Sequence, residues 1–218
     1  MIAARNEADR IGDTIEALRK AMPGAELVVG DDASGDGTGE VAISHGATLV
    51  GRKAPHGKGG NATAAAEALL SGSGAEVVLL CDGDLGESAG RLVALVEAVE
   101  RGDCDLAVAK FARGEGGGFG VALGYARDQI KRLCGFEAEA PISGQRAMRA
   151  EVLRDVLPFA DGFGMELGMT VDAVRAGHRV DEIELPLEHR ATYRTIGGFL
   201  HRLRQLRDFR RAVRARER

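Results

Sequence analysis

The sequence predicts an α/β fold, in which a mostly parallel β-sheet is covered by helices on both faces. Short apolar runs alternate along the chain with longer segments of helical periodicity, which is the pattern of repeated strand–helix units. One run, at 77–80, is apolar at every position, as in a parallel strand that is buried on both faces. The length of 218 residues suits one such domain with a substantial core.

The first half of the chain gives a regular succession of elements. Residues 1–4 resemble the end of a strand, so either the first strand is short or the natural chain begins upstream. Apolar residues at helical spacing predict a helix over 11–22, which Pro23 and Gly24 close. The elements expected next are a strand at 26–30, a helix at 38–45 stopped by Gly46, a strand at 48–50, an alanine-rich helix at 61–70, the strand at 77–80, a helix over 92–99 and a strand at 106–108.

The second half is less regular. Five glycines between 114 and 120 predict a loop, followed by a helix at 121–133, a strand at 142–148, a helix at 165–175 and a strand at 179–187. From 196 onward, apolar residues at helical spacing predict an amphipathic helix with an arginine-rich face. We therefore expect one domain over 1–195 and a basic helix over 196–218.

Composition indicates a folded protein without a general affinity for nucleic acid. Apolar residues make up 44% and charged residues 28%, and the net charge is −4. Cys81, Cys104 and Cys134 have no paired spacing, so we expect reduced thiols and neither a disulfide framework nor a zinc site. No run approaches the ~18 apolar residues of a membrane span, and no secretory leader is visible, so the sequence favours a cytoplasmic protein.

Two carboxylates follow the most apolar strand. Asp82 and Asp84 come directly after it, with only Gly83 between them. Ligands of open α/β sheets gather at the carboxyl ends of strands, and two carboxylates at this spacing can turn toward one cation. Mg²⁺ or Mn²⁺ prefers such oxygen ligands and leaves positions for diphosphate oxygens. An ordinary polar loop after a strand is the competing interpretation.

Two polar segments lie upstream of this pair. Residues 31–38 (DDASGDGT) supply carboxylates for a base or a ribose, although Asp36 and Thr38 also suit a turn and a helix cap. Residues 57–60 (GKGG) precede the alanine-rich helix. Glycines permit close backbone approach, a helix N-terminus favours anions, and Lys58 adds positive charge. This segment is a candidate diphosphate contact, with a structural turn as the alternative.

The order of these segments resembles family 2 glycosyltransferases with the GT-A fold. The resemblance rests on residues 2–7 (IAARNE), 28–38 (VVGDDASGDGT), 57–59 (GKG) and 82–85 (DGDL), and it covers nearly the whole chain. It implies a UDP- or GDP-sugar donor, Mg²⁺ or Mn²⁺, a nucleotide-sugar-binding half at 1–110 and an acceptor half at 111–195. It also implies that Asp84 is the direct metal ligand and a catalytic residue. The residues it implies for nucleotide-sugar binding are Ala3, Arg5, Glu7, Asp32, Lys58, Asp82 and Gly83.

The acceptor half resembles two branches of this family. Residues 142–146 (ISGQR), 162–166 (GFGME) and 188–190 (EHR) resemble polyprenyl-phosphate sugar synthases of the dolichyl-phosphate mannose type. Residues 110–113 (KFAR), the glycine-rich loop and the last two of these segments are also similar to glucosyl-3-phosphoglycerate synthases. In that second branch a histidine at this position completes the metal site. His189 is therefore the candidate third ligand beside Asp82 and Asp84, with a surface or packing histidine as the alternative.

Both branches act on a phosphorylated acceptor, for which polyprenyl phosphate is favoured here and a small soluble molecule such as 3-phosphoglycerate is the alternative. Arg113, Arg127 and Gln145 are the candidate ligands of the acceptor phosphate, and solvated surface charge is the alternative for Arg127. Glu166 and Arg190 are the further catalytic candidates. Glu166 suits a base, a ligand of sugar hydroxyls or a carboxylate that stabilises a helix dipole.

The basic C-terminal segment needs its own explanation. Residues 201–218 hold eight arginines against Asp208 and Glu217, a local net charge of +6. A helix on the inner face of the cell membrane would place Phe199, Leu203 and Leu206 at the lipid boundary, which suits a lipid-linked acceptor. A homodimer interface and a solvated basic end are the alternatives.

Two functions outside the transferases share parts of this pattern. A sugar nucleotidyltransferase also combines strand–helix alternation with a metal, but the segment after the first strand (AARNE) lacks the expected glycine-rich loop. A non-catalytic nucleotide-sugar-binding module is disfavoured by the intact pair of Asp82 and Asp84.

Overall fold

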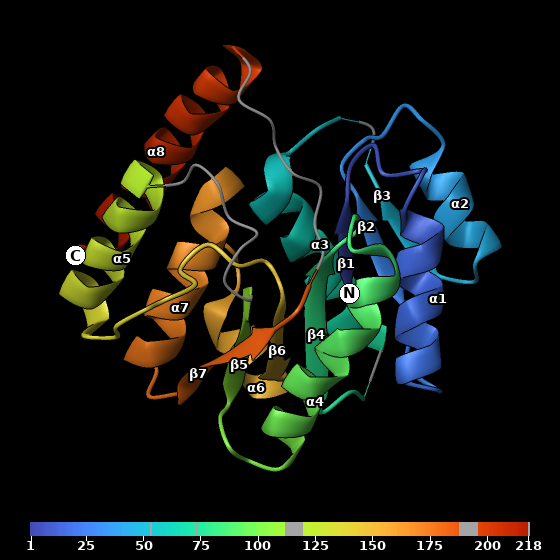
Figure 1. Ribbon diagram of the computed structural model, residues 1–218, viewed down its shortest axis with the longest axis horizontal. Coiled ribbons are helices and arrows are strands. Elements are labelled where there is room, and N and C mark those ends of the chain that lie inside the picture. The colour runs from blue at the N-terminus through green and yellow to red at the C-terminus, as the bar shows by residue number, and fades with distance from the viewer. Residues whose placement is uncertain (53, 73, 112–119, 188–195, 218) are drawn as a thin grey trace.

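A computed structural model describes residues 1–52, 54–72, 74–111, 120–187 and 196–217, with only the backbone at 121 and 196–203. Strands and helices alternate as the sequence predicts (Figure 1). The strands are β1 Ile2–Ala4, β2 Val28–Asp31, β3 Thr48–Gly51, β4 Val77–Asp82, β5 Leu106–Phe111, β6 Arg146–Arg149 and β7 Val180–Leu185. The helices are α1 Ile11–Ala21, α2 Thr38–Ser44, α3 Gly57–Gly72, α4 Val93–Glu100, α5 Gly120–Cys134, α6 Ala150–Val156, α7 Met165–Arg175 and α8 Ile196–Arg216, with 3₁₀ helices η1 Gly86–Leu92 and η2 Gly162–Gly164.

The strands form one sheet in the order β3-β2-β1-β4-β6-β5-β7. Only β6 runs antiparallel to its neighbours, β4 and β5, so the predicted mostly parallel sheet is confirmed. From β1 the chain builds outward through β2 and β3 and then crosses back to place β4 on the other side of β1. This change of direction is a topological switch point, and in open α/β sheets ligands bind at the carboxyl ends of the strands beside it.

Helices cover both faces of the sheet, and the strands alternate between two apolar clusters. On β4, Val78 and Leu80 point into the cluster built with α3, α6 and α7. Cys81 points into the opposite cluster, which α1 and α4 complete. The helical stripe of α1 consists of Ile11, Ile15 and Leu18, all buried in that second cluster.

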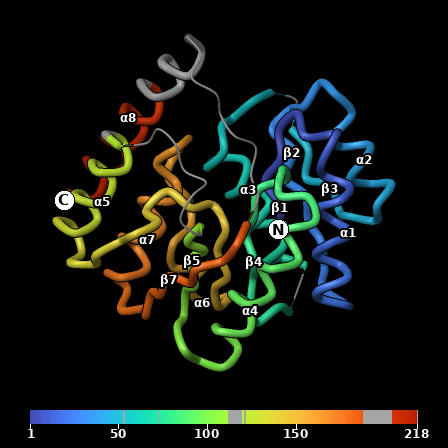
Figure 2. Tube along the Cα trace, viewed as in Figure 1, coloured from blue at the N-terminus to red at the C-terminus, as the bar shows by residue number. Residues whose placement is uncertain are grey.

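The C-terminal helix packs on the protein. In Figures 1 and 2, α8 lies beside α5 at one end of the molecule, and α8 also contacts α7. Phe209, Ala212 and Val213 are buried in a third cluster with apolar residues of α5 and α7, and Leu206 is partly buried against it. Arg216 pairs with Asp172 of α7. The apolar side chains described on α8 therefore face the domain, and no helix in the described ranges has the length and apolar character needed to cross a bilayer.

Three expectations about elements need correction. The strand expected at 142–148 begins only at Arg146, because residues 141–142 form a turn in which the N–H of Ser143 donates to the carbonyl of Ala140. The helix expected at 61–70 starts at Gly57, where the Asp32 carboxylate accepts from the backbone N–H groups of His56 and Gly57 and so holds the first turn. Helix α6 was not expected, since seven residues are too few for periodicity to reveal. The three cysteines are free, as expected.

Candidate active site

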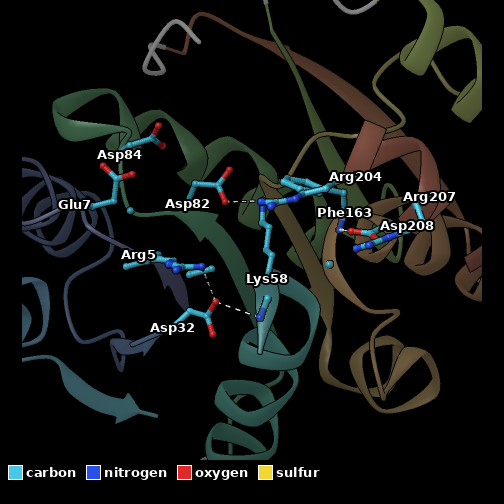
Figure 3. A pocket seen from close by; sticks show the side chains of 15 residues that line it. Arg5, Glu7, Asp32, Lys58, Asp82, Asp84, Phe163, Arg204, Arg207 and Asp208 are labelled. Atoms are coloured by element: carbon cyan, nitrogen blue, oxygen red, sulfur yellow. Dashed lines mark hydrogen bonds and ion pairs between the residues drawn. The ribbon is translucent and has the colours of Figure 1, made fainter. Parts of the chain in front are cut away.

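The predicted nucleotide-sugar residues meet in one cavity of about 500 Å³ at the carboxyl ends of β1 and β4. The register places Ala3 of β1 beside Asp82 of β4, which brings the segments that follow both strands together. Figure 3 shows the side chains that line this cavity. They belong to Ala3, Ala4, Arg5, Glu7, Asp32, Gly57, Lys58, Asp82, Gly83, Asp84, Gly162, Phe163, Arg204, Arg207 and Asp208.

The loops after β1 and β2 hold each other by hydrogen bonds. The backbone N–H of Asn6 donates to Ser34 Oγ (2.9 Å), and the Asn6 side chain accepts from the N–H of Gly35 (3.0 Å). The N–H of Glu7 donates to Thr38 Oγ1 (2.9 Å). Asp36 accepts from the N–H of Thr38 (3.1 Å) in the turn that precedes α2, whose N-cap residue is Gly37, so Asp36 fills the turn role that the sequence also allowed. These bonds fix the wall of the cavity that carries Arg5 and Glu7.

Asp32 lines the cavity and also shapes its floor. Its carboxylate accepts from the backbone N–H groups of His56 (2.7 Å) and Gly57 (3.1 Å), where α3 begins. Arg5 lies 3.7 Å from the same carboxylate. Asp32 therefore joins the loop after β2 to the first turn of α3. A contact to the nucleotide base, the role that the family resemblance implies, would be additional to this one.

Lys58 lies between two carboxylates. Its Nζ is 2.7 Å from Asp82 Oδ1 and 2.9 Å from Glu166 Oε1, the latter on the first turn of α7. Burial lowers the pKa of Lys58, but the attraction of the two carboxylates outweighs burial and holds that pKa above its usual value. Lys58 is therefore charged at neutral pH and links α3, β4 and α7 beneath the cavity.

The second oxygen of Asp82 is held by Gln145. The side-chain amide of Gln145 donates to Asp82 Oδ2 (2.9 Å), and its carbonyl accepts from the backbone N–H of Asp82 (3.0 Å). At Gly144 a Cβ atom would lie 2.6 Å from Lys58 Nζ and 2.8 Å from Asp82 Oδ2, so a larger residue would displace one of these two side chains. Asp82 is thereby fixed in position. Gln145, expected at the acceptor phosphate, lies in the structure against Asp82.

The turn from Gly83 to Asp84 is anchored from α1. The Thr14 hydroxyl donates to the carbonyl of Gly83 (2.9 Å), and the Arg10 guanidinium donates to the carbonyl of Asp84 (2.8 Å). These bonds hold the Asp84 side chain at the cavity, beside that of Glu7 in Figure 3. Carboxylate oxygens on the rigid end of a strand suit a hard divalent cation, so Asp82 and Asp84 fit the metal that the resemblance implies.

Gln145 and Glu166 lie behind the cavity lining, against Asp82 and Lys58, and four further predicted site residues are not found at the cavity. Arg113, His189 and Arg190 lie outside the described residues, so their assigned roles stay predictions. Arg127 on α5 is exposed and donates to the carbonyl of Glu139. Within the described ranges, no three His, Cys, Asp or Glu side chains come together as a metal site, and the candidate third ligand, His189, lies beyond those ranges.

The far wall of the cavity was not expected from the sequence. It is built by the turn of η2 and by α8, and its members are Gly162, Phe163, Arg204, Arg207 and Asp208. The GFG segment and the excess of arginines were visible as patterns in the sequence. What the sequence did not indicate was that α8 packs where some of its arginines reach the site.

Comparison with known proteins agrees with this geometry. The profile described as "Glycosyl transferase family 2" matches residues 1–157. An undecaprenyl-phosphate mannosyltransferase of Micrococcus luteus is 28% identical over 202 residues, which cover 87% of the chain and 83% of that protein. A glucosyl-3-phosphoglycerate synthase of Mycolicibacterium paratuberculosis is 31% identical over 192 residues. These cover 79% of the chain but only 58% of that longer protein.

Solved structures of glucosyl-3-phosphoglycerate synthase from Mycobacterium tuberculosis share the fold. The complex with phosphoglyceric acid has a TM-score of 0.78 and 25% identity, covering 99% of this chain and 77% of the other. The complex with Mn²⁺, UDP and glucosyl-3-phosphoglycerate has a TM-score of 0.77 and the same identity and coverage. The expected GT-A fold is thus confirmed. The family profile matches well over half of this chain. The chain therefore belongs to glycosyl transferase family 2 and is a glycosyltransferase.

Proposed function

We propose that this protein catalyses a metal-dependent reaction, in which a sugar is transferred from a nucleoside-diphosphate sugar to an acceptor that carries a phosphate group. The observation that carries the proposal is the cavity where Asp82 and Asp84 meet the nucleotide-side residues of β1 and the cations of α3 and α8. Relatives from both branches have a phosphorylated partner in their names, undecaprenyl phosphate in one case and 3-phosphoglycerate in the other.

In this proposal the nucleoside occupies the side of the cavity formed by the loops after β1 and β2. Ala3, Arg5 and Glu7 line that side, and the small Ala3 and Ala4 leave room for a base. Asp84 and Asp82 would hold Mg²⁺ or Mn²⁺, with His189 as the candidate third ligand. When bound, the metal supplies positive charge that stabilises the departing diphosphate.

The protein's own residues then orient the reactants. Lys58 fixes the Asp82 carboxylate on one side and Glu166 on the other, so the cavity floor needs little rearrangement during the reaction. Glu166 is paired with Lys58, and this favours the role of a ligand for sugar hydroxyls over that of a proton acceptor. An ionised phosphate acceptor needs no strong general base.

The identity of the acceptor is a more specific part of the proposal. The motifs of the second half favour a polyprenyl phosphate, with Arg113, Arg127 and Gln145 as the candidate ligands of its phosphate. The solved relatives bind phosphoglyceric acid, and one contains glycerol 3-phosphate. A specific observation supports a small acceptor as the second candidate: the apolar side chains described on α8 pack on α5 and α7 and do not face outward.

Donor turnover tests the proposal. Purified protein is incubated with UDP- and GDP-sugars and Mn²⁺ or Mg²⁺, together with either a short polyprenyl phosphate in detergent or 3-phosphoglycerate. We expect release of nucleoside diphosphate that depends on metal and on one of the two acceptors. Release of pyrophosphate would indicate a nucleotidyltransferase instead. A folded sample that neither binds nor turns over any donor of the panel would refute the proposal.

Membrane association is tested separately. We expect flotation with vesicles that contain anionic lipid if the acceptor is a polyprenyl phosphate, through the basic face of α8. Protein that ignores such vesicles but transfers sugar to 3-phosphoglycerate would assign the soluble acceptor. Sedimentation equilibrium of the same sample tests the homodimer.

A further inference from the structure

We propose that Arg204 and Arg207 of α8 form a subsite for the phosphate monoester of the acceptor. The inference rests on the proposed function and assigns to α8 a role in substrate binding. Both arginines line the cavity that holds Asp82 and Asp84, although they lie more than 100 residues away in the chain. Figure 3 shows them on one side of Lys58, with Arg5 and Asp32 on the other.

The first argument is the charge of the cavity. Lys58 forms ion pairs with two carboxylates, those of Asp82 and Glu166, and the three side chains together carry a net charge of −1. Arg5 lies at the nucleotide side, near Asp32. A phosphate monoester carries close to two negative charges at neutral pH. Such an acceptor therefore needs cations that are not already neutralised.

Arg204 meets this need, because within the described part of the chain it makes no hydrogen bond or ion pair. Arg207 meets it in part: it pairs with Asp208 at 3.3 Å, but its side chain is 59% exposed and can still reach a second anion. Residues three apart on a helix share a face, so both guanidinium groups can approach the same anion. Guanidinium groups bind phosphate oxygens in a bidentate manner.

The second argument is that the structure positions these arginines. Asp208, one helical turn beyond Arg204, is buried, and its carboxylate accepts from the backbone N–H of Phe163 (3.3 Å). A Cβ at Gly164 would lie 2.8 Å from Ala212 Cβ and 2.9 Å from the carbonyl oxygen of Asp208. The glycines of η2 therefore let α8 approach closely. This contact, together with the buried apolar face of α8, fixes the two arginines at the cavity wall.

The position also fits the chemistry. The acceptor must approach the sugar from the side of the cavity that the nucleoside does not occupy. The wall opposite Arg5 and Asp32 is formed by η2 and α8. A phosphate bound to Arg204 and Arg207 would lie on that side. A lipid-linked phosphate would attack the sugar through its own oxygen, whereas a small phosphate ester would attack through a hydroxyl and use its phosphate only for binding, so the test includes one ligand of each kind.

Equilibrium binding tests the subsite without relying on catalysis. The dissociation constants of 3-phosphoglycerate and of farnesyl phosphate in detergent are measured by titration calorimetry for wild type, Arg204→Gln and Arg207→Gln. Arg210→Gln is the matched control, because Arg210 is an exposed arginine of the same helix that does not line the cavity. UDP with Mn²⁺ is titrated as a reference for the nucleotide side. Unfolding midpoints confirm that each variant is folded.

We expect each cavity variant to weaken the phosphate ester about tenfold, the loss of one charge-assisted contact. Arg210→Gln and all UDP titrations should match wild type. If only the soluble ester or only the lipid phosphate binds, and binding depends on the two arginines, the result supports the subsite and shows which kind of acceptor it binds. Equal affinities in all four proteins, weakening of UDP instead of the ester, or a wild type that binds neither ester would overturn it.

Failure of the proposed function is distinguishable from failure of this inference. If no donor is turned over but ester binding depends on Arg204, the subsite stands and the transferase reaction is wrong. If sugar transfer proceeds with unchanged KM for the acceptor in both cavity variants, the transferase stands and the subsite is wrong.

Discussion

Lys58→Met removes the cation that lies between Asp82 and Glu166. The methionine keeps the length of the side chain but leaves two carboxylates facing each other without a positive charge. Loss of the Lys58 charge affects Glu166 more than Asp82, because the Glu166 side chain is only 5% exposed to solvent and that of Asp82 is 29% exposed. Removing one partner of a buried ion pair costs about 3–5 kcal/mol. Since Lys58 itself is 25% exposed, solvent screening reduces this cost, and we expect a loss at or below the lower end of that range, about 2–3 kcal/mol.

Urea unfolding measures this loss. For a chain of 218 residues, each kcal/mol corresponds to roughly 2–4 °C, so a thermal scan should show a fall of roughly 4–12 °C. The raised pKa of Lys58 keeps its contribution intact at neutral pH, and the contribution disappears only as the pH rises through that pKa in strong alkali. The measurement at pH 7.5 therefore reports the full effect.

Lys131→Met is the matched control. Lys131 Nζ also lies 2.7 Å from a carboxylate, that of Glu137, but both side chains are largely exposed, at 65% and 76%. Because solvent screens such a pair, we expect no measurable change in the urea midpoint. Adding Glu166→Gln to Lys58→Met should restore part of the lost stability, since the uncompensated buried charge is gone. Equal midpoints for the two single variants would refute the reasoning that burial makes the Lys58 link strong.

Three further changes test other parts of the structure. Asp84→Asn should lower the rate of sugar transfer at least about 100-fold while the unfolding midpoint stays unchanged, because a metal ligand is lost without a packing defect. Arg179 holds the pKa of Asp105 down at about 2 through a hydrogen bond to its carboxylate, so Arg179→Gln should lower the urea midpoint at pH 7. That stabilisation is present above about pH 4 and is lost as the pH falls through about 2, so the variant and wild type should converge there. Gly59→Ala places a Cβ onto the carbonyl of Ala160 and should cost at least about 2 kcal/mol, whereas Gly72→Ala, with nothing described within 4 Å, should be neutral in the same denaturation assay.

The sheet and most helices could be predicted from the sequence because their signals are local. The apolar run of β4 and the stripe of α1 each follow from the period of one element. The order of the strands is less local, and β6 shows the limit. Nothing in residues 146–149 distinguishes an antiparallel strand from a parallel one, since that choice depends on where α5 and the segment after it return the chain.

The candidate site could be predicted in composition but not in its internal bonds. Asp82, Asp84 and Lys58 were expected near a diphosphate, and they do share one cavity. The sequence did not indicate that Lys58 pairs with both Asp82 and Glu166, or that Gln145 holds Asp82. Two of these links, Lys58 with Glu166 and Gln145 with Asp82, join segments more than 60 residues apart. A charged residue in a motif therefore suggests a ligand contact even when part of its role is to hold a neighbour in place.

The C-terminal helix illustrates the same limit at a larger scale. Its period shows an apolar face and a basic face, but amphipathicity alone suits a lipid surface, a second subunit or the domain itself. The glycines of η2, elsewhere in the chain, have no side chain and so accept the backbone of α8 at close range on the domain. The apolar face of α8 then closes the cluster with α5 and α7. Because the apolar face of α8 packs on α5 and α7, helical spacing places Arg204 and Arg207 at the cavity. The described part of an arginine-rich helix thus forms a wall of the candidate cavity because a glycine-containing turn lets it pack there.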